Sequence, residues 1–136
     1  MGQQQVLFVI LAVCIIAIAV SVGVLSLSGH AVVDNRTLLS HDLELIARKA
    51  QGYYQLSSEQ GGGDGSFNLL SRMPDALSRL GFLASNAHGD FFVKKSTNSS
   101  SIQVVAVGIE SGYDRKRPLR MMITIWPDRT ALSILN

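Results

Sequence analysis

The chain has 136 residues, 47% of them hydrophobic, and twelve Lys and Arg against ten Asp and Glu give it a net charge of +2. This length allows one small domain with an additional element, and so weak a charge does not indicate a nucleic-acid-binding protein. The single cysteine, Cys14, lies in an apolar stretch, so the rest of the chain has neither a disulfide nor thiol chemistry. Every charged residue follows position 33, which separates an uncharged N-terminal part from a polar remainder.

Residues 6–27 form a continuous apolar run, called the apolar segment below. As a helix rising 1.5 Å per residue it would be about 33 Å long, close to the thickness of the hydrocarbon core of a bilayer. Because it is apolar on every face, we expect it to be buried in lipid, in protein, or in each at different times. A cleavable signal peptide fits poorly, since no basic residue precedes the run and no small-residue cleavage site follows it. A simple membrane anchor fits the length but lacks a charged flank at its N-terminal end.

Three residues, Ser21, Gly23 and Gly29, weaken the helix propensity near the end of this run. A glycine inside a helix costs about 1 kcal/mol relative to alanine. A helix that must bend or stretch would do so here, and the sequence leaves open whether it bends or simply continues. We therefore divide the chain into an apolar N-terminal helix, residues 1–28, and a globular part, residues 29–136.

Beyond Gly29 the apolar residues recur at steps of seven, four, three, four and three, which predicts one stripe along an amphipathic helix over residues 31–56. The members of the stripe, expected to pack a helix onto a sheet, are Val32, Leu39, Leu43, Ile46, Ala50 and Tyr53. A glycine-rich loop, residues 61–65, ends this helix, and we expect that loop to lie away from it. A short helix is predicted over residues 74–83, because Pro74 suits the first helical position.

The periodicity changes at residue 90, where β-branched and aromatic runs with short connections predict strands. The runs cover residues 91–93, 102–109, 119–126 and 131–135, within a predicted antiparallel sheet over 90–135. Such a sheet needs one covered face, and the stripe of the preceding helix is the available cover. The predicted fold class is therefore α+β, with a long N-terminal helix packed on a four-stranded antiparallel β-meander.

A long N-terminal helix, first apolar and then amphipathic, laid on an antiparallel meander resembles the bacterial type IV pilins and the pseudopilins of type II secretion. The resemblance covers the whole chain as an architecture and is strongest over residues 1–56, notably at 35–38 and 50–54. It implies a pilin fold and a structural subunit that polymerises through its apolar helix into an extracellular filament on the cell surface. The subunit would reside in the inner membrane before assembly.

The resemblance also implies partners. A prepilin peptidase would remove a short basic leader after a glycine, which would explain the missing charges and make Met1 the mature, methylated first residue. The other implied partners are the assembly machinery of a pilus or secretion system and further copies of the same chain. The family usually has glutamate at position five and a proline near position 22, where this chain has Gln5 and only Gly23 nearby. The Gln5 amide can accept a hydrogen bond from a neighbour's terminal amine but cannot form an ion pair.

The resemblance implies that the apolar helix makes the contacts between subunits in the assembled filament. The residues that we assign to it are Met1, Gln5, Val6, Leu7, Phe8, Ile10, Leu11, Ile15, Ile16, Ile18 and Val22. Two other interpretations remain: a pseudopilin that forms a short periplasmic pseudopilus, and a monomeric, membrane-anchored periplasmic binding domain.

Enzymatic chemistry is not indicated, and we expect no cofactor and no metal. The histidines, His30, His41 and His88, have no metal-binding spacing, and the His41–Asp42 pair is interpreted as a solvated helix face. One dense group of basic residues stands out, Arg115, Lys116, Arg117 and nearby Arg120. It is predicted to be a surface loop that either is solvated or forms salt bridges to a neighbouring subunit, with binding to DNA or to an anionic surface only weakly supported.

Overall fold

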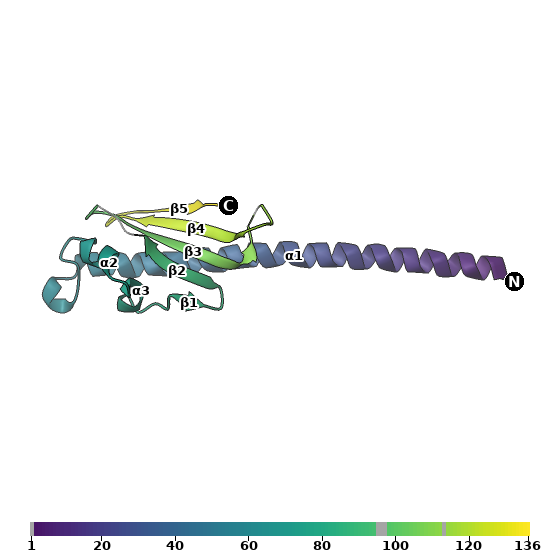
Figure 1. The fold of residues 1–136 in the computed structure, drawn as a ribbon, viewed down its shortest axis with the longest axis horizontal. Helices are drawn as coiled ribbons and strands as arrows, with labels where there is room; N and C mark the ends of the chain where they lie inside the picture. The colour runs from purple at the N-terminus through teal and green to yellow at the C-terminus, as the bar shows by residue number, and fades with distance from the viewer. Residues whose placement is uncertain (1, 95–97, 113) are drawn as a thin grey trace. The chain divides into compact units, whose positions relative to one another are not determined.

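The computed structural model describes residues 2–94, 98–112 and 114–136. Its helices are α1 (Gly2–Gln55), the 3-10 helix η1 (Ser58–Gln60), α2 (Asn68–Arg72) and α3 (Ala76–Arg79). The strands are β1 (Ser85–Asn86), β2 (Gly89–Lys94), β3 (Ile102–Ser111), β4 (Pro118–Ile125) and β5 (Thr130–Ile134), as Figure 1 shows. The chain divides into two compact units, one ending at Val33 and the other spanning Asp34–Asn136, which we call the headpiece.

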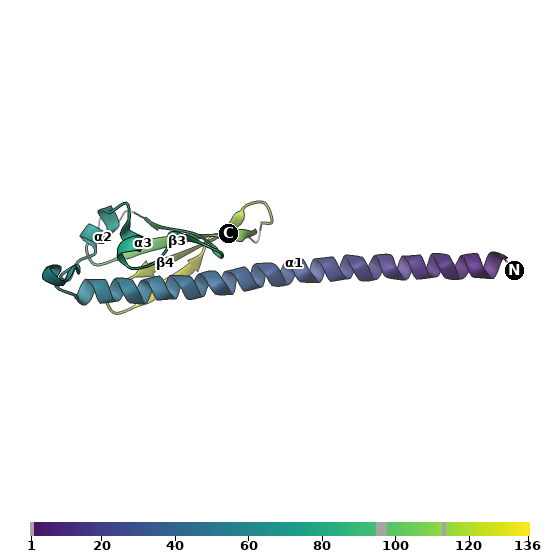
Figure 2. The same cartoon turned by 90° about the horizontal axis from the view of Figure 1, so that it is seen from below.

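The α+β prediction is confirmed, because the headpiece part of α1 lies along one face of an antiparallel sheet (Figure 2). The sheet has the strand order β1-β2-β3-β4-β5, so the prediction of four strands was wrong. The additional strand is β1, in which Ser85 pairs with Asp90 and Asn86 pairs with Gly89. Two residues are too few to show the alternating pattern by which strands are recognised in a sequence.

The core lies between α1 and the sheet. Leu39, Leu43, Ile46 and Ala50 are completely buried on the helix, and Tyr53 is buried one turn further on. Alternate residues of the strands complete the core, namely Phe91, Ile102, Val104, Ala106, Leu119, Met121, Ile123 and Ile125. Burying each Leu or Ile side chain contributes about 1.5–3 kcal/mol, so this interface holds the headpiece together. Val32, the first residue of the predicted stripe, is half-buried and belongs to the other unit.

The segment between the glycine loop and the sheet differs from the predicted helix over residues 74–83. Within that range only Ala76–Arg79 are helical, as α3, and a further short helix, α2, lies before Pro74. Met73, directly before Pro74, adopts an extended conformation with ψ 133°, as the clash with the proline ring requires, and this ends α2. At the other side Gly81 has φ +70°, which ends α3 well before residue 83.

The glycine loop lies against the C-terminal end of α1, not away from the helix as predicted. Gly63 N donates to Tyr53 O at 2.7 Å, and Gly65 N donates to Tyr54 O at 2.9 Å. These bonds satisfy carbonyls that the helix end would otherwise leave without partners. A side chain at Gly62 would place its Cβ 2.3 Å from the Leu56 Cβ, so the close approach requires glycine.

Candidate assembly surface

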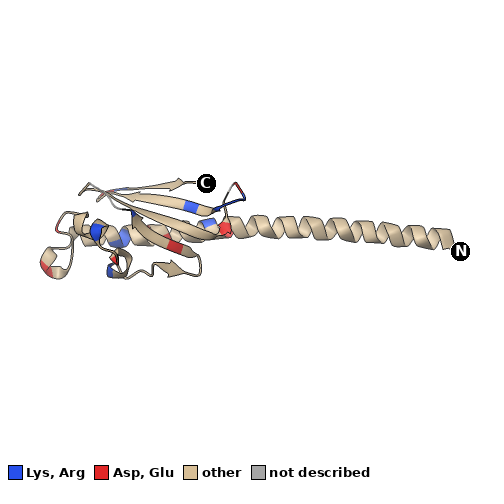
Figure 3. Cartoon of the chain, viewed as in Figure 1, with Lys and Arg blue, Asp and Glu red and all other residues tan. Residues whose placement is uncertain are grey.

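The apolar segment exposes all of its side chains in the isolated subunit. Each large hydrophobic residue from Val6 to Leu27 is between 54% and 72% exposed. Figure 3 shows no charged residue on this part of α1, in agreement with the sequence, where Asp34 is the first. By length and composition this helix could cross a membrane. A water-exposed surface of this kind is unstable on its own, so it indicates contact with lipid or with other proteins.

The residues at which the helix could have bent do not interrupt it, since α1 is continuous from Gly2 to Gln55. Ser21 Oγ donates to Ala17 O at 2.7 Å, which satisfies the hydroxyl within the helix itself. At Gly23 and Gly29, apart from the adjacent residues and the backbone of the neighbouring helical turns, no atom of the described residues lies within 4 Å of the position that a Cβ would take. The helix assignment is therefore not interrupted at these residues, and their role in helix flexibility stays a prediction.

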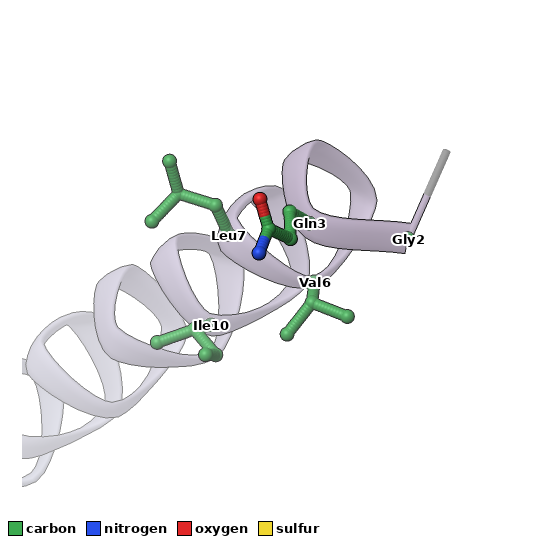
Figure 4. A pocket seen from close by; sticks show the side chains of 5 residues that line it. All are labelled: Gly2, Gln3, Val6, Leu7 and Ile10. Carbon is green, nitrogen blue, oxygen red and sulfur yellow. The ribbon is translucent and has the colours of Figure 1, made fainter.

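The N-terminal turns of α1 carry the residues that were assigned to assembly, and all the described ones are exposed. Met1 lies outside the described residues. Figure 4 shows a shallow hollow on this helix, lined by Gly2, Gln3, Val6, Leu7 and Ile10. The hollow is open and lies on the surface of a single helix, so it is no enclosed ligand pocket. Gln5 is exposed and does not line it.

The headpiece part of α1 is fastened to the sheet by a polar residue that the sequence analysis missed. Asn35 is only 4% exposed, and its Nδ2 donates to His88 O at 2.8 Å. Its Oδ1 accepts a longer hydrogen bond from Glu110 N at 3.4 Å. A Cβ at Gly108 would lie 2.3 Å from Asn35 Oδ1, so the helix crosses β3 where only glycine leaves room.

A second polar contact corrects the interpretation of Asp42 as a solvated residue. Asp42 is 6% exposed, and its Oδ2 accepts a hydrogen bond from Asn86 Nδ2 at 3.0 Å. The same oxygen lies 2.6 Å from His88 Nδ1, a contact that is an ion pair when the histidine is protonated. Asn86 Oδ1 also accepts from the backbone nitrogens of His88 and Gly89, so it shapes the turn between β1 and β2. The partners are more than forty residues apart, and no local spacing reveals them.

This polar cluster positions the β1–β2 turn on the helix. Its hydrogen bonds join elements of the headpiece to one another. Within residues 2–94, 98–112 and 114–136, no group of three or more His, Cys, Asp or Glu could hold a metal ion. His41, next to Asp42 in the sequence, is exposed.

The predicted basic loop lies between β3 and β4, and Arg120 lies on β4 itself. Asp114 organises the turn, since its Oδ1 accepts from Lys116 N and Arg117 N at 3.1 Å each. Its Oδ2 accepts from Arg117 Nε at 2.9 Å. The bond from the Arg117 side chain, with the two backbone bonds, lowers the pKa of Asp114 below its ordinary value. Arg115, Lys116, Arg117 and Arg120 are all exposed.

Comparisons with known protein families, with curated proteins and with solved structures found no match to the chain.

Proposed function

We propose that the chain is the structural subunit of an extracellular, type IV pilus-like filament that polymerises through its apolar segment. Before assembly the segment would cross the inner membrane, and afterwards it would be surrounded by the same segment of neighbouring copies. A prepilin peptidase would process the N-terminus, and pilus or secretion machinery would extract the subunit. The supporting observation is a fully exposed, uncharged helix that continues directly into a helix packed on its own sheet.

The physical argument concerns the two environments that this segment can occupy. Lipid tails are as apolar as Leu and Ile side chains, so moving the helix from bilayer to filament yields little hydrophobic free energy. Close packing between helices must supply the difference. Small residues such as Ala17, Ala19 and Gly23 allow helices to approach closely, and they lie within the exposed stretch.

Two alternatives use the same features. A pseudopilin would polymerise in the same way but form a short periplasmic structure, which differs in abundance and length. A monomeric anchor would keep the segment in lipid permanently. Only the anchor makes no use of contacts between apolar segments. An experiment that detects such contacts therefore separates the anchor from the two candidates that polymerise.

The test combines electron microscopy of material sheared from the cell surface with the reactivity of Cys14, which is exposed in the middle of the apolar segment. We expect filaments that contain this chain, with a first residue that mass spectrometry identifies as processed. Cys14 should react with a maleimide in detergent-solubilised subunits and be protected in filaments, because neighbouring helices would cover it.

A matched control uses Ser111→Cys in a Cys14→Ser background, because Ser111 is exposed on the headpiece. We expect its reactivity to change less on assembly than that of Cys14. Absence of any assembled species, with the chain monomeric in the membrane, would favour the anchor. Short assemblies confined to the periplasm would favour the pseudopilus.

A further inference from the structure

The basic cluster, defined as Arg115, Lys116, Arg117 and Arg120, lies at one particular end of the headpiece. The preceding strand brings Glu110 N to Asn35 Oδ1, one residue from the start of the headpiece at Asp34. Arg120 N donates to Asn136 Oδ1 at 2.7 Å, so the chain's last residue lies there too. The connection from β3 to β4, visible in Figures 1 and 3, therefore lies at the end of the headpiece where the chain enters it.

Most of the positive charge of this cluster is not paired with a carboxylate among the described residues. Residues 114–120 contain four cations and one carboxylate. Asp114 is paired with Arg117, while Arg115, Lys116 and Arg120 form no ion pair within the described residues. Asp34 and Glu110 lie at the same end of the headpiece, and their negative charge would repel an anion. The attraction for an anion therefore comes from the basic residues of the turn. Asp114 accepts hydrogen bonds from Lys116 N and Arg117 N, and Arg115 has a left-handed conformation with φ +53°, so residues 114–117 form a defined turn.

The connection to the apolar segment is short. Residues 28–33 separate Leu27 from Asp34, and a connection of this length spans at most about 25 Å even when fully extended. If the apolar segment spans a bilayer, this short connection raises the concentration of the cluster near the bilayer surface, where the charge of anionic headgroups would act on it.

We propose that the basic cluster binds anionic phosphate headgroups in the leaflet on the headpiece side while the subunit is in the membrane. The inference rests on the proposed membrane-inserted state of the subunit. Arginine guanidinium groups bind phosphate oxygens in pairs, and basic residues next to a membrane-spanning helix are attracted to anionic lipid. A lipid surface fits better than nucleic acid, because the cluster is small and is tied by a short connection to a membrane-spanning helix. The contacts are lost when the subunit leaves the bilayer.

The experiment uses the full chain in lipid nanodiscs, with Cys14→Ser and a fluorophore on Ser111→Cys beside the cluster. One set of nanodiscs contains phosphatidylcholine alone, and the other also contains phosphatidylglycerol. Both sets include a trace of lipid with a spin label on its headgroup, which quenches a nearby fluorophore. We expect stronger quenching in the anionic nanodiscs, and loss of that difference in high salt.

Two triple variants make the result specific. The first neutralises the free cations of the cluster: Arg115→Gln, Lys116→Gln and Arg120→Gln. The matched control neutralises three exposed cations outside the cluster, on α2, α3 and the far end of β2: Arg72→Gln, Arg79→Gln and Lys94→Gln. We expect the first variant to abolish the extra quenching in anionic nanodiscs and the second to retain it.

The outcomes distinguish this inference from the proposed function. A chain that does not copurify with either nanodisc would overturn the membrane-inserted state itself. A chain that inserts but is quenched equally in both lipids, or whose two triple variants behave alike, would overturn the lipid contact alone. If short duplex DNA, and not anionic lipid, changes the emission of the fluorophore, the cluster recognises nucleic acid and the proposal is wrong.

Discussion

The two parts of α1 present similar apolar side chains to opposite environments. Leu25 in the apolar segment is 69% exposed, whereas Leu43 in the headpiece is completely buried. Both residues belong to one uninterrupted helix, so helix propensity does not explain the difference. The headpiece carries its own sheet as a partner for Leu43, while no side chain among the described residues covers Leu25. Under the proposed function, the exposed part of α1 is the part that contacts lipid or neighbouring copies.

The largest expected effect comes from removing one of the two parts. Deleting residues 1–28 should give a soluble monomer whose headpiece remains folded, because the buried core lies within Asp34–Asn136. Size-exclusion chromatography and circular dichroism would measure assembly and folding separately. Filaments formed by this fragment would mean that the apolar segment is not the assembly surface.

Paired leucine substitutions compare the two parts at the level of one side chain. Leu43→Ala should lower the headpiece's free energy of unfolding by about 2–5 kcal/mol, since it leaves a cavity in the core. Leu25→Ala should leave that free energy unchanged, because Leu25 is exposed. Chemical denaturation in detergent, followed by Trp126 fluorescence, provides the measurement. Equal losses of unfolding free energy in the two variants would contradict the division of α1 into a buried and an exposed part.

Two aspartates on α1 test whether the polar cluster holds the headpiece together. Asp42→Ala leaves the donors of Asn86 and His88 without their acceptor and should cost about 1–3 kcal/mol of stability. Asp34→Ala, an exposed position at the start of the headpiece, should change stability by about 0.5 kcal/mol or less. The same denaturation experiment compares them, and an effect at Asp34 as large as that at Asp42 would be inconsistent with the structure.

The smallest effect is expected at the N-terminal glutamines. Gln5→Leu should weaken assembly modestly, by about 0.5–1.5 kcal/mol per subunit, if its amide hydrogen-bonds a neighbour's terminal amine or backbone. Gln5→Glu should be tolerated if that amine is near, because an ion pair could form. Gln4→Leu is the matched control, one residue away on another face of the helix. Filament yield measured by sedimentation would assign no special role to position five if wild type and both leucine variants agree.

The sequence predicted those features whose cause is local. The stripe from Leu39 to Tyr53 repeats at helical spacing, and it gives the packing of α1 on the sheet directly. The strands β2 to β5 follow from β-branched runs between turn residues. The number of strands was wrong because β1 has two residues, and its pairing depends on the turn that Asn86 shapes.

The features that were missed depend on residues far apart in the chain. Asp42 looked solvated because its neighbours His41 and Glu44 are polar, yet its partners come from residues 86 and 88. In the sequence, Gly108 looks like an ordinary residue of a strand. Only the structure shows that a side chain at this position would collide with Asn35 on α1. The glycine loop could not be placed on the end of α1, because hydrogen bonds to Tyr53 and Tyr54 leave no periodic signal.

The continuity of α1 has a mechanical consequence. A pull on the apolar segment would pass along one helix into the headpiece and reach the sheet first at Asn35, whose amide is held by β3 and by the β1–β2 turn. The completely buried residues Leu39, Leu43 and Ile46 follow at successive turns and would share the load. Detaching the helix would require sliding this whole row across the sheet at once, so the headpiece should withstand tension along α1 better than force applied across it.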